Sequence, residues 1–146
     1  MKRVYIDMDN VLVDFASGIA RLNYTTRMEY ADRLDEVPGI FALMDPVPGA
    51  IEAVHRLAAK YDVYILSTAP WNNPSAWADK VSWVTKYLDD VLHKRLILSH
   101  QKDLLKGDYL IDDRHKHGAN TFEGEWIQFG TDPFRDWEAV LKYLNA

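Results

Sequence analysis

The chain has 146 residues, 48% hydrophobic and 27% charged, with a net charge of -5 and no cysteine. This length suits one compact domain, and the composition is that of an ordinary globular protein, not of a disordered or repetitive one. The absence of cysteine excludes thiol chemistry and disulfides, and the negative charge argues against binding to nucleic-acid polymers. No apolar run approaches the ~20 residues of a membrane span. We therefore expect a cytoplasmic protein without a membrane partner.

The first predicted strand is Arg3-Val4-Tyr5-Ile6, which ends at two aspartates, Asp7 and Asp9. The segment from 17 to 45 follows it. This segment has a mostly helical pattern and is longer than a typical connection between a strand and a helix. We predict that it forms a small helical cap beside a site at the end of the first strand.

Four further runs predict the remaining strands of a sheet. Three of them are short and apolar and are typical of buried parallel strands, whereas the last alternates in polarity, as a strand at a sheet edge does. In chain order these runs are 63–66, 95–98, 109–111 and 125–129.

Helical periods separate several of these strands. One helix is predicted to begin after Gly49, and a second carries an apolar stripe over residues 77–88, which we expect in the core. For the last helix, Asp132 is the predicted N-cap and Pro133 the first helical residue.

This alternation predicts a single α/β domain over residues 1–146. Its centre is a doubly wound (Rossmann-like) parallel sheet of about five strands, with the small cap inserted after the first strand. Ligands of such folds bind beyond the carboxyl ends of the strands. Polar residues follow four predicted strands there, and we expect them to converge: Asp7, Asp9, Ser67, Thr68, Lys102, Asp112 and Asp113.

The carboxylates in this set suit phosphoryl transfer. Asp7 can attack phosphorus and form a covalent acyl phosphate, which divides hydrolysis into two easier steps. Asp9 lies on the same side and can protonate the leaving oxygen. Magnesium prefers carboxylate oxygens, which Asp7 and either Asp112 or Asp113 can supply.

The remaining residues suit the binding of a phosphate group. Thr68 and nearby backbone amides can hold its oxygens, and Lys102 can neutralise its charge without bidentate geometry. The histidines lack a convincing ligand spacing and are interpreted as surface or loop residues, although His115 and His117 lie close enough to the acidic pair to reach the far side of a substrate.

The whole set resembles the signature of the haloacid dehalogenase (HAD) superfamily of aspartate-nucleophile phosphatases, whose four motifs occur here in the same order. Within that superfamily the chain is most similar to the 5'(3')-deoxyribonucleotidases. The segments that carry the similarity are Asp7 to Phe15, Pro48 to Ala50, Ser67 to Pro70, Trp83-Val84 with Lys86-Tyr87, and Leu110 to Arg114.

The resemblance implies roles for individual residues. Asp7 is the nucleophile, and Asp9 is the acid/base and a metal ligand through its backbone carbonyl. The resemblance favours Asp113 over Asp112 as the metal ligand. Phosphate contacts are implied at Thr68, Ala69 and Lys102, and substrate contacts at Phe15 and Phe41, to which Trp71 is added because it lies just past the phosphate loop.

Two positions depart from the family pattern. Asn10 stands where the family usually has glycine, and asparagine is the residue that best replaces glycine at positive φ. Ala69 stands where serine is common, which leaves phosphate binding there to the backbone amide.

The predicted function is a magnesium-dependent phosphatase of nucleoside monophosphates that works through a phosphoaspartate. A HAD phosphatase of sugar phosphates or other small phosphometabolites is the enzymatic alternative. A phosphoacceptor signalling domain would carry its acceptor aspartate at a central strand, but here the strand at 63–66 ends in Ser67-Thr68. A nucleotide-binding domain without catalysis is disfavoured because all four chemical positions are filled. A homodimer is left open.

Overall fold

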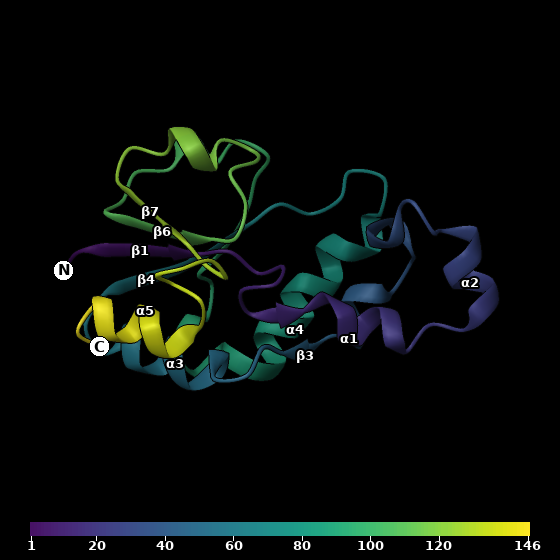
Figure 1. Cartoon of the computed structure of the whole chain (residues 1–146), viewed down its shortest axis with the longest axis horizontal. Helices are drawn as coiled ribbons and strands as arrows, with labels where there is room; N and C mark the ends of the chain where they lie inside the picture. The colour runs from purple at the N-terminus through teal and green to yellow at the C-terminus, as the bar shows by residue number, and fades with distance from the viewer.

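The computed structural model describes residues 1–146 and has a five-stranded parallel sheet in the order β5-β4-β1-β6-β7 (Figure 1). Ile6 is in register with Ile65 on one side and with Ile111 on the other, so three neighbouring strands end at the same edge. The predicted fold class is confirmed. The strands are β1 (Arg3–Ile6), β4 (Asp62–Ser67), β5 (Leu96–Leu98), β6 (Tyr109–Asp112) and β7 (Glu125–Gln128).

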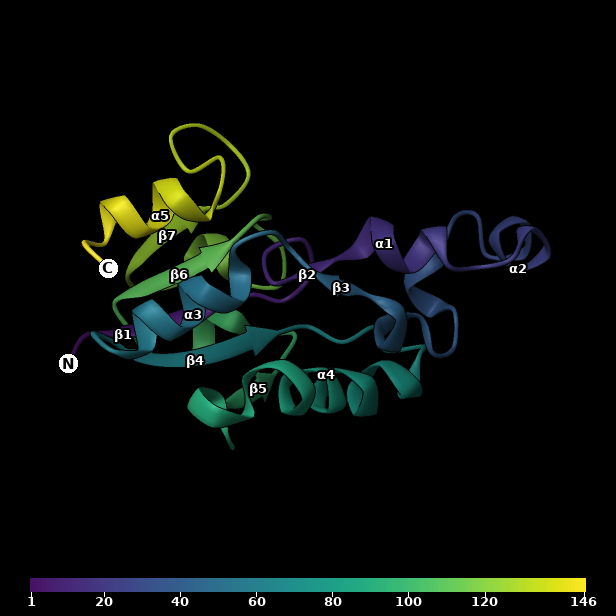
Figure 2. The ribbon, with the colours of Figure 1, turned by 90° about the horizontal axis from the view of Figure 1, so that it is seen from below.

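The two faces of the sheet are covered differently. Helices α3 (Ala50–Ala58), α4 (Pro74–Leu92) and α5 (Trp137–Tyr143) pack side by side on one face, with α3 in the middle (Figure 2). The other face is covered by the short 3-10 helices η3 (Lys102–Leu104) and η4 (Ala119–Thr121) and the residues around them. Because side chains alternate along a strand, Val4 and Ile6 face the α-helices whereas Tyr5 faces the 3-10 layer.

Helix α4 departs from its predicted stripe at one residue. Val84 and Leu88 are buried as expected, but Val81 is 52% exposed. Val81 borders a surface groove that it shares with Leu96 and Leu98 of β5. Because β5 is an edge strand, no further element covers this side of the helix.

The last helix begins later than predicted. The N-cap of α5 is Asp136, whose carboxylate accepts a hydrogen bond of 2.9 Å from the amide of Ala139. Asp132 instead belongs to a turn in which the Phe134 amide donates to the Thr131 carbonyl at 2.7 Å. Both aspartates suit an N-cap in sequence, and this turn leaves only the second one at the start of the helix.

The segment between β1 and α3 projects beyond the carboxyl ends of the strands (Figures 1 and 2). Its stem pairs β2 (Val13–Asp14) with β3 (Asp45–Pro46) in antiparallel fashion. A Cβ on Gly18 would lie 2.9 Å from Met44, so a residue without a side chain is needed where the first helix packs against the return segment. The projecting elements are α1 (Phe15–Ala20), α2 (Tyr24–Glu29), η1 (Leu34–Glu36) and η2 (Ile40–Leu43).

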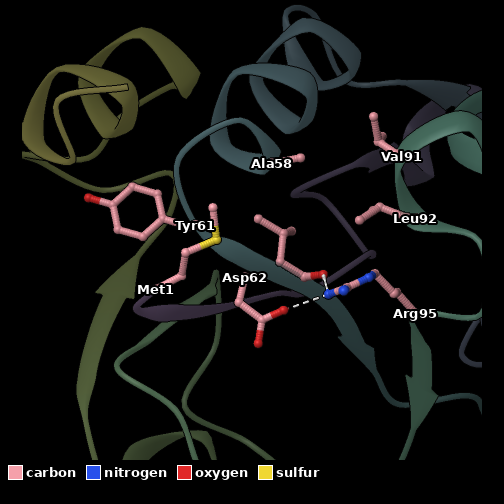
Figure 3. A pocket seen from close by; sticks show the side chains of 8 residues that line it. Met1, Ala58, Tyr61, Asp62, Val91, Leu92 and Arg95 are labelled. Atoms are coloured by element: carbon pink, nitrogen blue, oxygen red, sulfur yellow. Dashed lines mark hydrogen bonds and ion pairs between the residues drawn. The ribbon is translucent and has the colours of Figure 1, made fainter.

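A hollow of about 170 Å³ lies at the opposite, amino-terminal end of the strands (Figure 3). Its walls include Met1, Ala58 and Tyr61. Its charged side chains, Asp62 and Arg95, pair with each other at 2.6 Å. None of the helices has the length and apolar character required to cross a membrane.

Candidate active site

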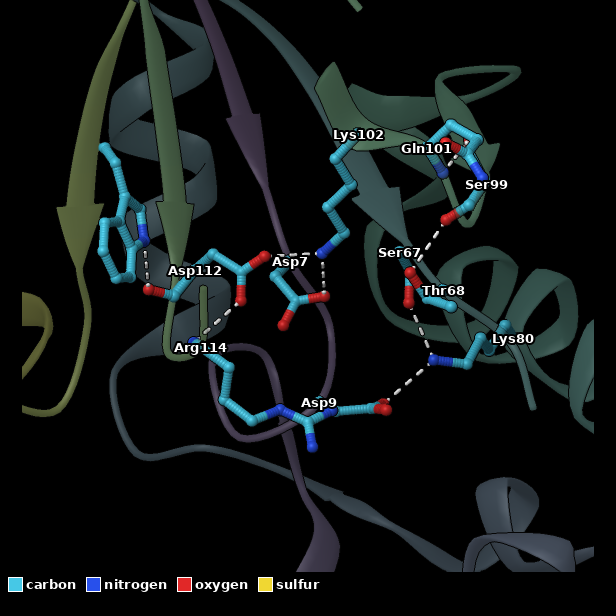
Figure 4. A network of polar contacts seen from close by, with 11 residues as sticks. Asp7, Asp9, Ser67, Thr68, Lys80, Ser99, Gln101, Lys102, Asp112 and Arg114 are labelled. Carbon is cyan, nitrogen blue, oxygen red and sulfur yellow. Dashed lines mark hydrogen bonds and ion pairs between the residues drawn. The ribbon is translucent and has the colours of Figure 1, made fainter. Parts of the chain in front are cut away.

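A buried lysine joins two aspartates at the carboxyl edge of the sheet. The Lys102 ammonium lies 3.0 Å from Oδ1 of Asp7 and 2.6 Å from Oδ2 of Asp112 (Figure 4). All three residues are less than 10% exposed. Burial opposes the charge on Lys102, but the two carboxylates hold its pKa above the usual value. The sheet thus brings together residues that are 95 positions apart in the chain.

The turn after β1 presents Asp7 and Asp9. The carbonyl of Met8 accepts hydrogen bonds from the amides of Leu12 and Val13 at 2.8 and 2.9 Å, which closes the chain into a tight loop. Asn10 adopts a φ of 62° in this loop. The expectation that asparagine can take the place of glycine here is confirmed.

Three carboxylates form a candidate metal site. Oxygens of Asp7, Asp112 and Asp113 lie within 4.8 Å of one another. Both oxygens of Asp112 are engaged, one by Lys102 and one by the Arg114 amide at 3.1 Å. By contrast, Oδ1 of Asp113 is buried without a hydrogen-bond partner. A hard divalent cation fits this donor set, and Asp113 has the oxygen that most needs one.

The burial and close packing of these carboxylates raise the pKa values of Asp7 and Asp113. Burial, together with the negative charges of Asp112 and Asp9, raises the pKa of Asp7 to about 7. Burial and the neighbouring Asp7 raise the pKa of Asp113 to about 6. Bringing the carboxylates together therefore disfavours their ionised forms unless positive charge is added.

The loop after β4 has donors that are free to bind an anion. The hydroxyl of Thr68 donates to the Ser99 carbonyl at 2.8 Å, so its only proton is engaged. The backbone amides of Thr68 and Ala69 donate to no acceptor within the protein. These two amides are therefore free donors at the start of the loop, next to Asp7 and Lys102.

Sequence reasoning missed Lys80, which lies on α4 and is completely buried. Its ammonium is 2.9 Å from Oδ1 of Asp9 and 2.7 Å from Oγ of Ser67. A signal was present in the sequence: Lys80 lies three residues after Trp77 and four before Val84, on the apolar stripe. A cation in such a position must find a partner in the core.

Two adjoining pockets meet at this site. The smaller one is lined by Asp7, Lys102 and other polar residues only. The second, of about 290 Å³, extends from Asp9 and Thr68 to Trp71. Its remaining walls come from the loop after β4, from η1 and from basic residues that follow β5 and β6, namely Ala69, Pro70, Asn72, Asp35, Glu36, His100, Arg114 and His117.

Two histidines lie closer to the site than their sequence spacing indicated. The rings of His100 and His117 are 5.6 Å apart, and His100 also contacts Trp71 and Trp77. Partial burial, the neighbouring His100 ring and the positive charge of Lys102 lower the pKa of His117. His117 lines both pockets and His100 lines the larger one, whereas His115 lines neither.

The aromatic residues expected to contact substrate differ in position. Trp71 is 77% exposed and lines the larger pocket. Phe15 is half-buried and lines neither pocket. Phe41 is 2% exposed, and its ring packs edge-on against Phe15 at 5.8 Å. This structure therefore does not support a direct substrate contact for Phe41, because neighbouring side chains cover its ring.

The fold and this site together define a phosphatase of the HAD type. A solved HAD-type hydrolase of Bacillus subtilis, bound to magnesium, superposes with a TM-score of 0.68 over 99% of both chains at 11% identity, which establishes the shared fold. The family model described as "5' nucleotidase, deoxy (Pyrimidine), cytosolic type C protein" matches residues 24–142. The chain belongs to this family and is a phosphoric monoester hydrolase of the 5'-nucleotidase type.

Relatives from a phage and a bacterium match nearly the whole chain. A protein of Vibrio phage KVP40 named "Putative 5'(3')-deoxyribonucleotidase" is 58% identical over 98% of this chain and 84% of its own length. The 5'(3')-deoxyribonucleotidase of Bacillus subtilis is 29% identical over 99% of this chain and 95% of its own.

Proposed function

We propose that the protein is a magnesium-dependent 5'(3')-deoxyribonucleotidase that removes the phosphate of deoxynucleoside monophosphates through a phosphoaspartate on Asp7. The observation that carries this proposal is the buried Asp7 carboxylate. Lys102 binds one of its oxygens, and beside it lies Asp113, whose Oδ1 is buried without a hydrogen-bond partner. Family membership and the names of the relatives supply the substrate class.

Asp7 acts as the nucleophile in this mechanism. Lys102 binds Oδ1 and leaves Oδ2 free to form a bond with phosphorus as the bond from phosphorus to the leaving oxygen breaks. The amides of Thr68 and Ala69 bind phosphate oxygens, and Lys102 balances the added negative charge.

Asp9 acts as the general acid and then as the general base. Its carboxyl gives a proton to the leaving oxygen and, once ionised, takes one from the water that hydrolyses the phosphoaspartate. The side chain is 18% exposed and lines both pockets, so it can reach a leaving group that extends from the phosphate into the larger pocket.

Asp7, Asp113 and the backbone carbonyl of Asp9 would hold Mg²⁺, and Asp112 would support the cluster while it binds Lys102. When bound, the ion supplies positive charge that reduces the repulsion between the carboxylates and the phosphate. The buried, partnerless Oδ1 of Asp113 supports this assignment.

The nucleoside occupies the larger pocket, where Trp71 offers a face for stacking with a base. Residues 17–45 act as a cap over this pocket. Two cap residues, Asp35 and Glu36, line it, and Asn72 links the cap to the loop after β4 by a 3.2 Å hydrogen bond to Glu36. Phe15 lies outside this pocket and packs against Phe41 of the cap.

A substrate panel tests the proposed function. Phosphate release is measured from five deoxynucleoside monophosphates, three sugar phosphates and p-nitrophenyl phosphate, with Mg²⁺ and with EDTA. We expect Mg²⁺-dependent hydrolysis of deoxynucleotides and its loss, by a factor of roughly 10³ or more, in Asp7→Asn, because no other group replaces a covalent nucleophile.

Two results would contradict the proposal. Faster release from sugar phosphates than from any deoxynucleotide would favour the alternative of a phosphometabolite phosphatase. Activity that persists in Asp7→Asn would exclude the phosphoaspartate.

A cytosolic location, in keeping with the family description, and a homodimer are further proposals, which fractionation and sedimentation can test.

A further inference from the structure

Lys80 is the only lysine besides Lys102 that the fold buries. Burying an ammonium is costly unless each of its protons finds an acceptor. The proposed chemistry assigns Lys80 no direct contact with substrate, since it lines neither pocket. Its burial therefore calls for a different explanation.

Three partners surround the ammonium of Lys80. Asp9 accepts through Oδ1 at 2.9 Å, and Ser67 accepts through Oγ at 2.7 Å (Figure 4). The third is Phe41, whose ring centroid lies 4.6 Å from Nζ. An ammonium has three N–H groups, and the negative face of an aromatic ring attracts a cation, so the side chain is fully satisfied.

We propose that Lys80 is a positioning residue for Asp9: it orients the Asp9 carboxyl and balances the charge that Asp9 acquires during proton transfer. With Oδ1 held by Lys80, Oδ2 has no partner within the protein and is the oxygen that carries the proton. This inference rests on the proposed phosphatase function.

The charge balance explains why a cation is needed. When Asp7 forms its bond to phosphorus, the bond to the leaving oxygen breaks and that oxygen takes the proton from Oδ2 of Asp9. Asp9 is then a carboxylate among other acids at the site. Lys80 lies next to this new charge and stabilises it in a poorly hydrated position, where such an interaction is stronger than in water.

Phe41 acquires a role in this arrangement that does not require contact with substrate. Its buried ring comes from η2 in the projecting segment and covers the ammonium. Ser67 holds the same ammonium from the end of β4. The position of the projecting segment is thereby coupled to the orientation of Asp9.

The test compares two leaving groups. A nucleoside alkoxide needs a proton in order to depart, whereas p-nitrophenolate does not. We expect Lys80→Met to lower the kcat/KM for a deoxynucleoside monophosphate by a factor on the order of 10². The kcat/KM for p-nitrophenyl phosphate should fall by a factor of less than ~10. kcat/KM is the relevant quantity because it reports only the steps up to phosphorylation of Asp7.

Pre-steady-state kinetics give a second readout. Because Asp9 also deprotonates the attacking water, hydrolysis of the phosphoaspartate should slow in Lys80→Met more than its formation from p-nitrophenyl phosphate. A burst of p-nitrophenolate equal to the enzyme concentration is expected. A variant with merely loosened packing would not separate the two steps.

Lys86→Met is the matched control, because Lys86 is an exposed lysine of the same helix with no contact at the site. It should leave both substrates unaffected. Ser67→Ala and Phe41→Leu remove one partner of Lys80 each and should show the same preferential loss, several-fold in size. If circular dichroism shows that Lys80→Met does not fold, these two variants are used for the comparison instead.

Equal losses for the two substrates in Lys80→Met, or in both milder variants, would overturn the role of Lys80 and leave the proposed function standing. If the wild-type protein hydrolysed neither substrate with Mg²⁺ present, the proposed function itself would fail and this inference with it.

Discussion

Asp112 and Asp113 are adjacent in sequence, but the structure gives them different tasks. Asp112 is 2% exposed and binds Lys102, whereas Asp113 is less buried and keeps one partnerless oxygen. The side chains of two adjacent residues at the end of a strand point to opposite sides of the sheet, so only one of the two aspartates can turn toward Lys102. The same aspartate pair thus contains a support for the lysine and a candidate metal ligand.

This difference gives a prediction at the scale of single residues. Asp113→Asn should raise the Mg²⁺ concentration needed for half-maximal activity at least ~10-fold, since even indirect partners of a metal contribute that much to its affinity. Asp112→Asn should mainly lower kcat, because it loosens Lys102. Titration of activity with Mg²⁺ distinguishes them, and equal metal requirements in the two variants would refute the assignment.

At the scale of elements, the start of α5 depends on its packing. Trp137, its first residue, is 2% exposed and donates a hydrogen bond of 2.8 Å to the carbonyl of Val11 in the loop after β1. The last helix therefore helps to hold the loop that carries Asp7 and Asp9. This contact joins residues 126 positions apart, so it cannot be predicted from the local pattern of N-cap residues and prolines.

The position of the N-cap can be tested by stability. Asp136→Ala should lower the free energy of unfolding by about 1 kcal/mol, because the Ala139 amide loses its acceptor. Asp132→Ala removes only an exposed ion pair with Arg135 and should change it by less than ~0.5 kcal/mol. Urea unfolding followed by circular dichroism measures both, and a larger effect at Asp132 would restore the earlier helix start.

For the whole molecule, the acidic cluster makes stability depend on pH and metal together. Folded Asp7 keeps its proton up to a pH of about 7, whereas a free aspartate loses it near its ordinary pKa of 3.8. Between these values the native state binds more protons than the unfolded state, so stability falls as pH rises. The raised pKa of Asp113 acts in the same direction up to about 6.

We therefore expect the metal-free protein to lose a few kcal/mol of stability between pH 4 and 7 as these carboxyls ionise. Mg²⁺ should restore much of the lost stability at pH 7, because a ligand that binds only the folded state stabilises that state. Thermal unfolding across pH, with Mg²⁺ and with EDTA, measures both effects. Asp7→Asn should flatten the metal-free profile, and an unchanged slope in that variant would count against the cluster as its source.

The sequence alone determined the strands, the polar residues that follow them and the chemistry they suit. Buried strands are short apolar runs, and in a parallel sheet their carboxyl ends share one edge, so local pattern was enough to bring Asp7, Thr68 and Lys102 together. Positive φ at Asn10 was predictable for the same reason, since it depends on residue type within one turn.

Only the tertiary structure decided the partners of buried charges and the covering of aromatic rings. The apolar stripe of the helix indicates that Lys80 is buried, but only the folded chain brings its partners Asp9, Ser67 and Phe41 around it. The choice of Asp136 over Asp132 likewise depended on a turn and on distant packing. Burial and long-range contacts set the free energy of such groups, and neither quantity is contained in a local pattern of residues.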